Sequence, residues 1–249
     1  METQNQKRGL KFTKHLNVVG GFCMLLLPMV VLADSCIYDE QLAFTLPVAA
    51  ITSLDVSAGA GSLYVSSDAN TQEISIRARV CGNRKTGLEG MGVEHLVQGN
   101  TQYLWTKIPE RKGISWAHNV AYIDLEIVIP EGMDMVVKDG SGSLEIRGAG
   151  NLVLNDGSGD ARLVDVLGNV QVKDGSGDLS IEYVQGSVDV DDGSGQLDIF
   201  NVLGAVSIRD GSGDINLRDL QLEPRIVESG SGKVRIDGRN GNTEVSDAH

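Results

Sequence analysis

Five aspartates at near-constant spacing are the residues of this chain whose type and pattern most suggest chemistry. Each opens an Asp-Gly-Ser-Gly tetrapeptide, with intervals of 17, 18, 18 and 18 residues, at Asp139, Asp156, Asp174, Asp192 and Asp210. In a stack of coils these carboxylates would lie one above another. Calcium binds several carboxylate and carbonyl oxygens. The aspartates are therefore a candidate calcium column, and the sequence suggests no other cofactor.

A purely structural role for Asp-Gly-Ser-Gly is the alternative. Glycine supplies the positive φ of a tight corner, and Asp and Ser hydrogen-bond local backbone in turns. The calcium-binding solenoid pattern Gly-Gly-x-Gly-x-Asp-x-apolar-x repeats every nine residues, about half the period found here. The intervening half-coils, such as Val184–Val188, lack the aspartate and the second glycine. These departures favour the structural interpretation.

Catalysis finds little support among the remaining residues. Gly-Ser-Gly is not the Gly-x-Ser-x-Gly nucleophile elbow. Of the histidines beyond residue 33, His95, His118 and His249, none stands at metal-ligand spacing from a cysteine or another histidine. His95, in a glycine-rich segment, is interpreted as a solvated loop residue. The chain has enough carboxylates to supply the pair of acidic residues that a glycosidase needs. A carbohydrate-active enzyme is therefore the third candidate function, after the two non-enzymatic functions described below.

The segments between the tetrapeptides predict short β-strands. Five and seven residues after each motif start stand apolar side chains, as in Leu179 and Ile181, and two and four residues before it stand others, as in Val188 and Val190. A period of two rich in β-branched residues indicates strands. Repetition at a fixed short period is typical of a solenoid. The fold class is therefore all-β: a parallel β-solenoid of 17–19-residue coils, with two or three faces per coil and a less regular N-terminal β portion.

The chain divides into three parts. Residues 1–33 resemble a secretory signal peptide, with a basic start, an apolar run from Val18 to Leu32 and a small residue, Ala33, at the cleavage position. The alternative is a membrane anchor, for which the run is short. Residues 34–130 form the irregular portion, and residues 131–249 form regular coils continuous with it, the last motif being Ser229–Gly232. No membrane span is expected after cleavage.

The net charge limits the classes of partner that the protein could bind, and the cysteine count bears on whether it contains a disulfide. The net charge of −13 becomes −16 when residues 1–33, which carry +3, are removed. This excess of acid argues against nucleic acid and anionic membrane surfaces as partners. Two cysteines, Cys36 and Cys81, then remain. Export and an even count suggest that they form a disulfide, with two free buried thiols as the alternative.

Within the irregular portion the sequence predicts a decayed first coil, a loop and a hairpin. Leu54–Val65 has apolar residues at the offsets of the regular coils, so it predicts an opening coil. Gly82 to about Gly99 predicts a long loop. Tyr103–Trp105 and Ile114–Trp116 predict a hairpin around a charged turn. The aromatic residues of this hairpin could form an exposed binding patch, or pack over the open end of the solenoid.

The segment Leu125–Gly132 is followed by repeated coils such as Asp174–Ile181. In this segment and in these coils the chain resembles the bacterial putative-adhesin family of exported β-solenoid domains. The resemblance covers roughly residues 50–237 and implies no catalytic residues. It implies a non-enzymatic, adhesin-like binding or scaffold protein of the bacterial envelope. Its partner would be a protein or glycan of the envelope or of a surface. A periplasmic structural or regulatory module that docks on an envelope partner is the second candidate. The expected location is outside the cytoplasm: the periplasm by default, or the cell surface or medium.

Overall fold

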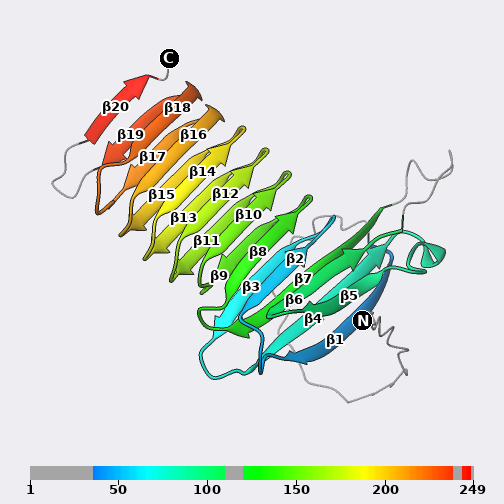
Figure 1. Cartoon of the computed structure of the whole chain (residues 1–249). Coiled ribbons are helices and arrows are strands. Elements are labelled where there is room, and N and C mark those ends of the chain that lie inside the picture. The colour runs from blue at the N-terminus through cyan, green and yellow to red at the C-terminus, as the bar shows by residue number, and fades with distance from the viewer. Residues whose placement is uncertain (1–35, 110–119, 238–242, 248–249) are drawn as a thin grey trace, which may run out of the picture. The chain divides into compact units, whose positions relative to one another are not determined.

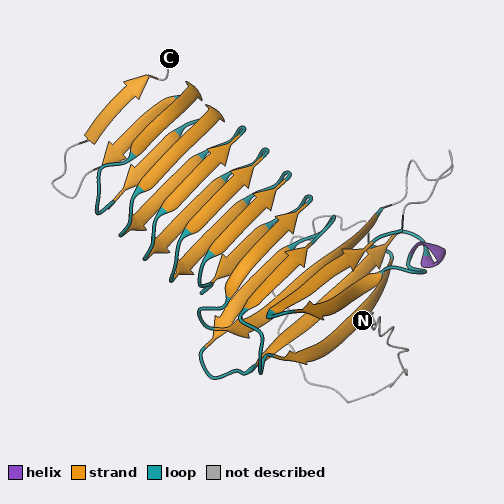
Figure 2. Cartoon of the chain, in the orientation of Figure 1, coloured by secondary structure: helices purple, strands orange, loops and turns teal. Residues whose placement is uncertain are grey.

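The computed structural model describes residues 36–109, 120–237 and 243–247. The described residues belong to one compact unit. The predicted signal peptide, the predicted hairpin arm Ile114–Trp116, and His118 and His249 lie outside the described residues. Apart from one short 3-10 helix, Lys85–Gly87, all regular structure in the described part is β-strand (Figure 2). None of it is a helix able to cross a membrane.

The described strands form two sheets, which we call the long sheet and the short sheet. In spatial order the long sheet contains β1 (Tyr38–Pro47), β4 (Glu73–Gly82), β7 (Ala121–Pro130), β3 (Leu63–Asp68), β9 (Leu144–Arg147), β11 (Ala161–Val166), β13 (Leu179–Val184), β15 (Leu197–Val202), β17 (Ile215–Arg218), β19 (Lys233–Asp237) and β20 (Thr243–Asp247). The short sheet contains β18 (Arg225–Ser231), β16 (Val206–Ser212), β14 (Val188–Asp192), β12 (Val170–Asp174), β10 (Leu152–Asp156), β8 (Asp134–Asp139), β2 (Ser53–Ser57), β6 (Thr101–Lys107) and β5 (Gly92–Gln98).

Each regular coil contributes one strand to each sheet, so the coil has two faces. From β8 and β9 to β18 and β19, equivalent strands of successive coils pair in parallel and stack side by side (Figure 1). This confirms the predicted parallel solenoid of about six turns with coils of about 18 residues. Apart from one aspartate per coil on the short sheet and Gln102, the buried side chains of the described strands are apolar and form one continuous core. Leu179 and Ile181, for example, are at most 1% exposed.

The decayed repeat is a coil of the same stack. Leu54 and Val56 in β2 pair with Met135 and Val137 in β8, and Leu63 in β3 pairs with Leu144 in β9. This is the register expected from the shared apolar offsets. More than sixty residues separate the two coils in the chain. Part of that segment forms β6 and β7, which pair in parallel on the other side of β2 and β3.

The prediction of a loop from Gly82 to Gly99 is wrong for its second half. Gly92–Gln98 is strand β5, which pairs antiparallel with β6. The hairpin partner of Tyr103–Trp105 is therefore the strand before it in the chain. The turn between them is Gly99–Asn100, with Gly99 at φ 63°. A Gly-Asn pair between two strands is a signal of a β-hairpin. It is hard to recognise here because the same stretch contains several other glycines.

Cys36 and Cys81 form a disulfide, with their Cα atoms 5.5 Å apart. Cys81 lies near the end of β4, and the adjacent strand β1 pairs with β4 along its whole length. The bond therefore attaches the start of the described chain to the N-terminal end of the long sheet.

Glycines at the coil corners allow the coils to stack at strand spacing. In the tetrapeptide of the middle coil, Gly177 has φ 137°, and its N–H donates to the Ser194 carbonyl of the next coil at 3.0 Å. A Cβ on Gly177 would overlap the carbonyl oxygen of Gly159 in the preceding coil. The equivalent glycines of neighbouring coils have the same relation. The motif thus needs glycine for φ and for close approach between coils.

Candidate functional site

The five aspartates of the predicted column point into the solenoid. The first four end β8, β10, β12 and β14, and Asp210 lies two residues before the end of β16. Each stands two positions after an inward apolar residue, as Asp174 follows Val172. Because side chains alternate along a strand, an aspartate two positions from an inward valine also faces inward. All five side chains are only 2–6% exposed. This orientation could have been inferred from the sequence. The apolar residues two and four positions before each aspartate lie on the same side of the strand as the aspartate.

The aspartates stack directly on one another. Parallel pairing places each opposite its equivalent in the next coil, from Asp139 through Asp156, Asp174 and Asp192 to Asp210. From Asp156 onward, successive side chains lie within hydrogen-bonding reach of each other. When the side chains are ionised, no donor reaches either carboxylate oxygen of the first four aspartates or Oδ1 of Asp210.

Burial dominates the acidity of this column. Burial, together with the charge of neighbouring aspartates, raises the pKa of Asp139 and Asp174 to about 7 and that of Asp210 to about 6. Burial also raises the pKa of Asp156 and Asp192, although backbone N–H groups of the following turn, such as those of Gly157 and Ser158 beside Asp156, oppose the shift. These N–H groups lie near the carboxylates without reaching hydrogen-bond geometry.

Calcium binding by the column stays a prediction. Among the described residues, no three His, Cys, Asp or Glu side chains come together as a metal site. Three further aspartates, Asp160, Asp178 and Asp214, stand four residues after members of the column, and the first two have a structural role. The Asp160 carboxylate accepts the Asp178 backbone N–H at 3.2 Å, and the Asp178 carboxylate accepts that of Gln196 at 2.9 Å. Each of these side chains therefore joins one coil to the next.

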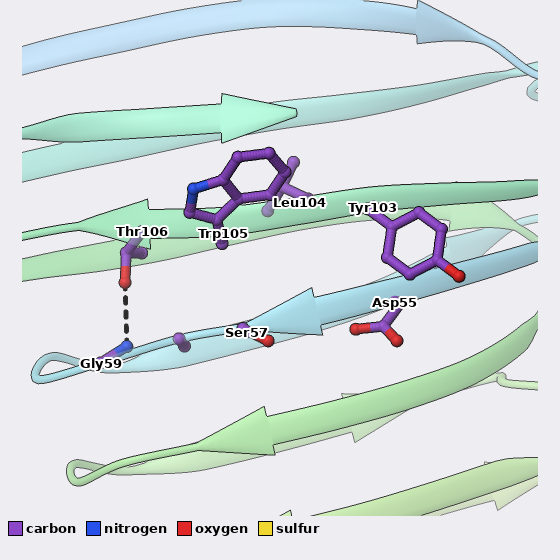
Figure 3. A pocket seen from close by; sticks show the side chains of 8 residues that line it. Asp55, Ser57, Gly59, Tyr103, Leu104, Trp105 and Thr106 are labelled. Carbon is purple, nitrogen blue, oxygen red and sulfur yellow. Dashed lines mark hydrogen bonds between the residues drawn. The ribbon is translucent and has the colours of Figure 1, made fainter. Parts of the chain in front are cut away.

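A groove of about 400 Å³ lies on the outer surface of the short sheet near its N-terminal end (Figure 3). Tyr103 and Trp105 project from β6, and Asp55 and Ser57 are their register neighbours on β2. Both aromatic side chains are half-buried. At one end of the groove the Thr106 hydroxyl accepts the Gly59 N–H at 2.9 Å. The arrangement presents aromatic faces beside a carboxylate and hydroxyl groups.

A row of polar side chains continues from this groove across the short sheet. We call it the outer row; in register order it contains Trp105, Ser57, Lys138, Asn155, Lys173, Asp191 and Arg209. The five members from Lys138 to Arg209 are exposed. Within the described part of the chain, no member of the row makes a side-chain hydrogen bond or an ion pair. The sequence analysis did not identify this row, because its members are spread over seven strands.

The outer surface of the long sheet is different, because its polar side chains bind one another. Arg162 donates to both carboxylate oxygens of Glu182, at 2.9 and 3.0 Å, and the Asn216 amide donates to Asp198 at 2.8 Å. The Arg218 guanidinium lies 5.5 Å from the centre of the Phe200 ring. Lys107 and Glu94 on β6 and β5 also form an ion pair, at 2.6 Å. The outer row of the short sheet is therefore where charged groups remain available to a partner.

His95 is not part of a loop. It lies in β5 and its ring stacks on Phe44 of β1, with centroids 5.6 Å apart. Burial lowers its pKa. This contact joins the edge strands of the two sheets, so His95 has a packing role at the N-terminal end of the stack.

Residues 79–246 match the family model described as Toastrack DUF4097. The chain belongs to this family. The match covers all the regular coils of the Toastrack domain and confirms the resemblance on which the sequence analysis relied. A search of curated proteins finds no match.

Three solved structures resemble this Toastrack chain at low sequence identity. A putative cell adhesion protein from Clostridium sporogenes is 13% identical with a TM-score of 0.42, covering 81% of this chain and 100% of its own. Putative adhesins from Bacteroides fragilis and Parabacteroides distasonis are 12% and 14% identical, with TM-scores of 0.30 and 0.28. Each of these two alignments covers 78% of this chain and 97% of the other.

Proposed function

We propose that the protein is a non-enzymatic, adhesin-like binding protein of the bacterial envelope that takes a glycan on the short sheet. The observation that carries the proposal is the outer row, a line of exposed polar side chains without partners in the described chain, which begins at the groove of Tyr103 and Trp105. Sugars present hydroxyl groups around apolar ring faces. Aromatic faces beside Asp55 and Ser57 suit both parts of such a ligand.

Replacement of Trp105 tests the ligand class. We expect Trp105→Ala to weaken glycan binding by about tenfold or more, because a stacked aromatic face contributes on the order of 1 kcal/mol and its loss also opens the groove to water. Binding of the purified protein would be measured first on a glycan array and then by calorimetry with the oligosaccharide found.

Tyr64→Ala is the matched control for that experiment. Tyr64 is an aromatic residue on a strand as well, but it is exposed on the outer surface of the long sheet. Its replacement should leave the affinity unchanged. Equal losses in the two variants, or no glycan bound by the parent protein, would contradict a glycan site on the short sheet.

Protease accessibility on intact and osmotically opened cells tests the location. We expect a tagged form of the protein to be digested on intact cells, which would support a direct adhesive role. Protection until the envelope is opened would place the protein in the periplasm. The surface-adhesin form of the proposal would then fail, and the periplasmic docking module would replace it.

A further inference from the structure

The interior aspartates pose an electrostatic problem that the fold does not resolve with donors. In parallel strands, equivalent residues stand about 4.8 Å apart. Five carboxylates at that spacing in an apolar interior would repel one another strongly, and each would lose its hydration. Apart from these aspartates, Gln102 is the only buried polar side chain in the described part. No lysine, arginine or histidine in that part is buried with them.

The groups around the column do not supply a cation site. Calcium needs six to eight oxygen ligands. The backbone carbonyls of Asp139, Asp156 and Asp174 are each occupied, because each accepts a glycine N–H of the next coil at 3.0–3.1 Å. On the same strands the charged neighbours, such as Lys173 and Asp191, point outward. The inward side chains of the facing long sheet are apolar.

We infer that the five aspartates form an interior ladder that binds protons, in which protons shared between successive carboxyls replace the missing donors. A protonated carboxyl donates one hydrogen bond, and an ionised one accepts it. Three protons link the three gaps between Asp156, Asp174, Asp192 and Asp210, and a fourth neutralises Asp139, which stands opposite Asp156. The ladder then carries one negative charge instead of five. Each shared proton joins two oxygens, one donating and one accepting, that are unpaired when both carboxyls are ionised.

This ladder makes the stability of the solenoid depend on pH in an unusual direction. A carboxyl whose pKa is higher in the folded chain than its ordinary 3.8 binds more protons when folded. Its stabilising contribution is therefore complete at or below about pH 4 and is lost as the pH rises through about 7. The domain should be most stable under mildly acidic conditions. Ionisation of the ladder at alkaline pH should loosen the stack from within.

The test measures melting of the purified protein between pH 5 and pH 8. We expect the melting temperature to fall by about 10 °C over this range, since several carboxyls ionise in the interior. Asp192→Asn keeps the shape of the side chain but adds donors that do not titrate, so it should reduce this fall by about half. Asp191→Asn, one position away on the exposed face, removes the same charge and should leave the fall unchanged. A melting temperature that is constant or rises with pH, or equal effects of the two variants, would overturn the inference.

Infrared spectroscopy detects the protons directly and does not depend on a variant that folds. At pH 6 the parent protein should show the C=O band of protonated carboxylic acids, and this band should disappear as the pH rises to 8. Absence of the band at pH 6 would overturn the proposal. Melting with millimolar calcium, and with a chelator, separates the two candidate ligands. If calcium raised the melting temperature at pH 6 and abolished the band, the column would hold calcium and not protons.

Discussion

Ile181→Asp should lower the free energy of unfolding by about 5 kcal/mol, a large part of the stability of an ordinary domain. Ile181 is fully buried in the middle coil, between Leu163 and Ile199 of the adjacent strands. An aspartate there would lose the buried apolar surface and would have no carboxyl above or below it with which to share a proton. The five native aspartates differ in this respect, because each stands next to another. Urea unfolding followed by circular dichroism would measure the loss.

Val153→Asp is the control for this substitution. Val153 is 41% exposed on the outer surface of the short sheet, with Val136 and Gln171 as its register neighbours. An aspartate there remains hydrated, so we expect a change within about 0.5 kcal/mol. If Ile181→Asp melted within a degree or two of the parent protein, the side chain at 181 would not be in the core and the inward register of β13 would be wrong.

Gly177→Ala should cost about 3 kcal/mol, although it adds a single methyl group. Part of the cost comes from φ 137°, which residues with a Cβ rarely adopt. The larger part comes from the overlap of the new Cβ with the Gly159 carbonyl, which would force two coils apart at a corner. Because every coil packs on its neighbours, the strain should also weaken the pairing of β11 with β13. Thermal and urea unfolding would measure the effect.

Gly99→Ala separates these two causes. Gly99 also has a positive φ, 63°, but nothing lies within 4 Å of the position that its Cβ would take. The variant therefore carries only the conformational cost, about 1 kcal/mol. If the two alanine variants lost the same stability, close approach between coils would not be the reason for glycine at position 177.

Local pattern accounts for much of what could be predicted before the structure. Alternation of apolar residues within a coil depends only on the geometry of a strand, so Leu179 and Ile181 could be assigned to the core. The decayed coil Leu54–Val65 could be recognised because its offsets match those of the regular coils. The wrong assignment of β5 has a local cause as well. Gly92–Gln98 is an edge strand with little burial, so its alternation is weak.

The candidate sites could be predicted only in part. The aspartates were singled out by their spacing, and even their inward direction follows from parity with Val172 and its equivalents. Their lack of donors does not follow from the sequence, because it depends on which backbone groups of the adjacent coils are already bonded. The aromatic pair Tyr103 and Trp105 was identified as a candidate patch. Its polar neighbours were not, since they come from other coils.

By itself the sequence determined the repeat length, the strand alternation and the identity of the core, because these are properties of one coil repeated along the chain. The tertiary structure alone decided which coils are neighbours where the repeat is irregular. Strand β2 lies between β6 and β8, so Trp105 and Lys138, 33 positions apart in the sequence, flank Ser57 in one row. The stacking order of irregular coils depends on how well the side chains and strand edges of neighbouring coils pack together. That packing involves segments far apart in the chain, so a local sequence pattern does not predict it.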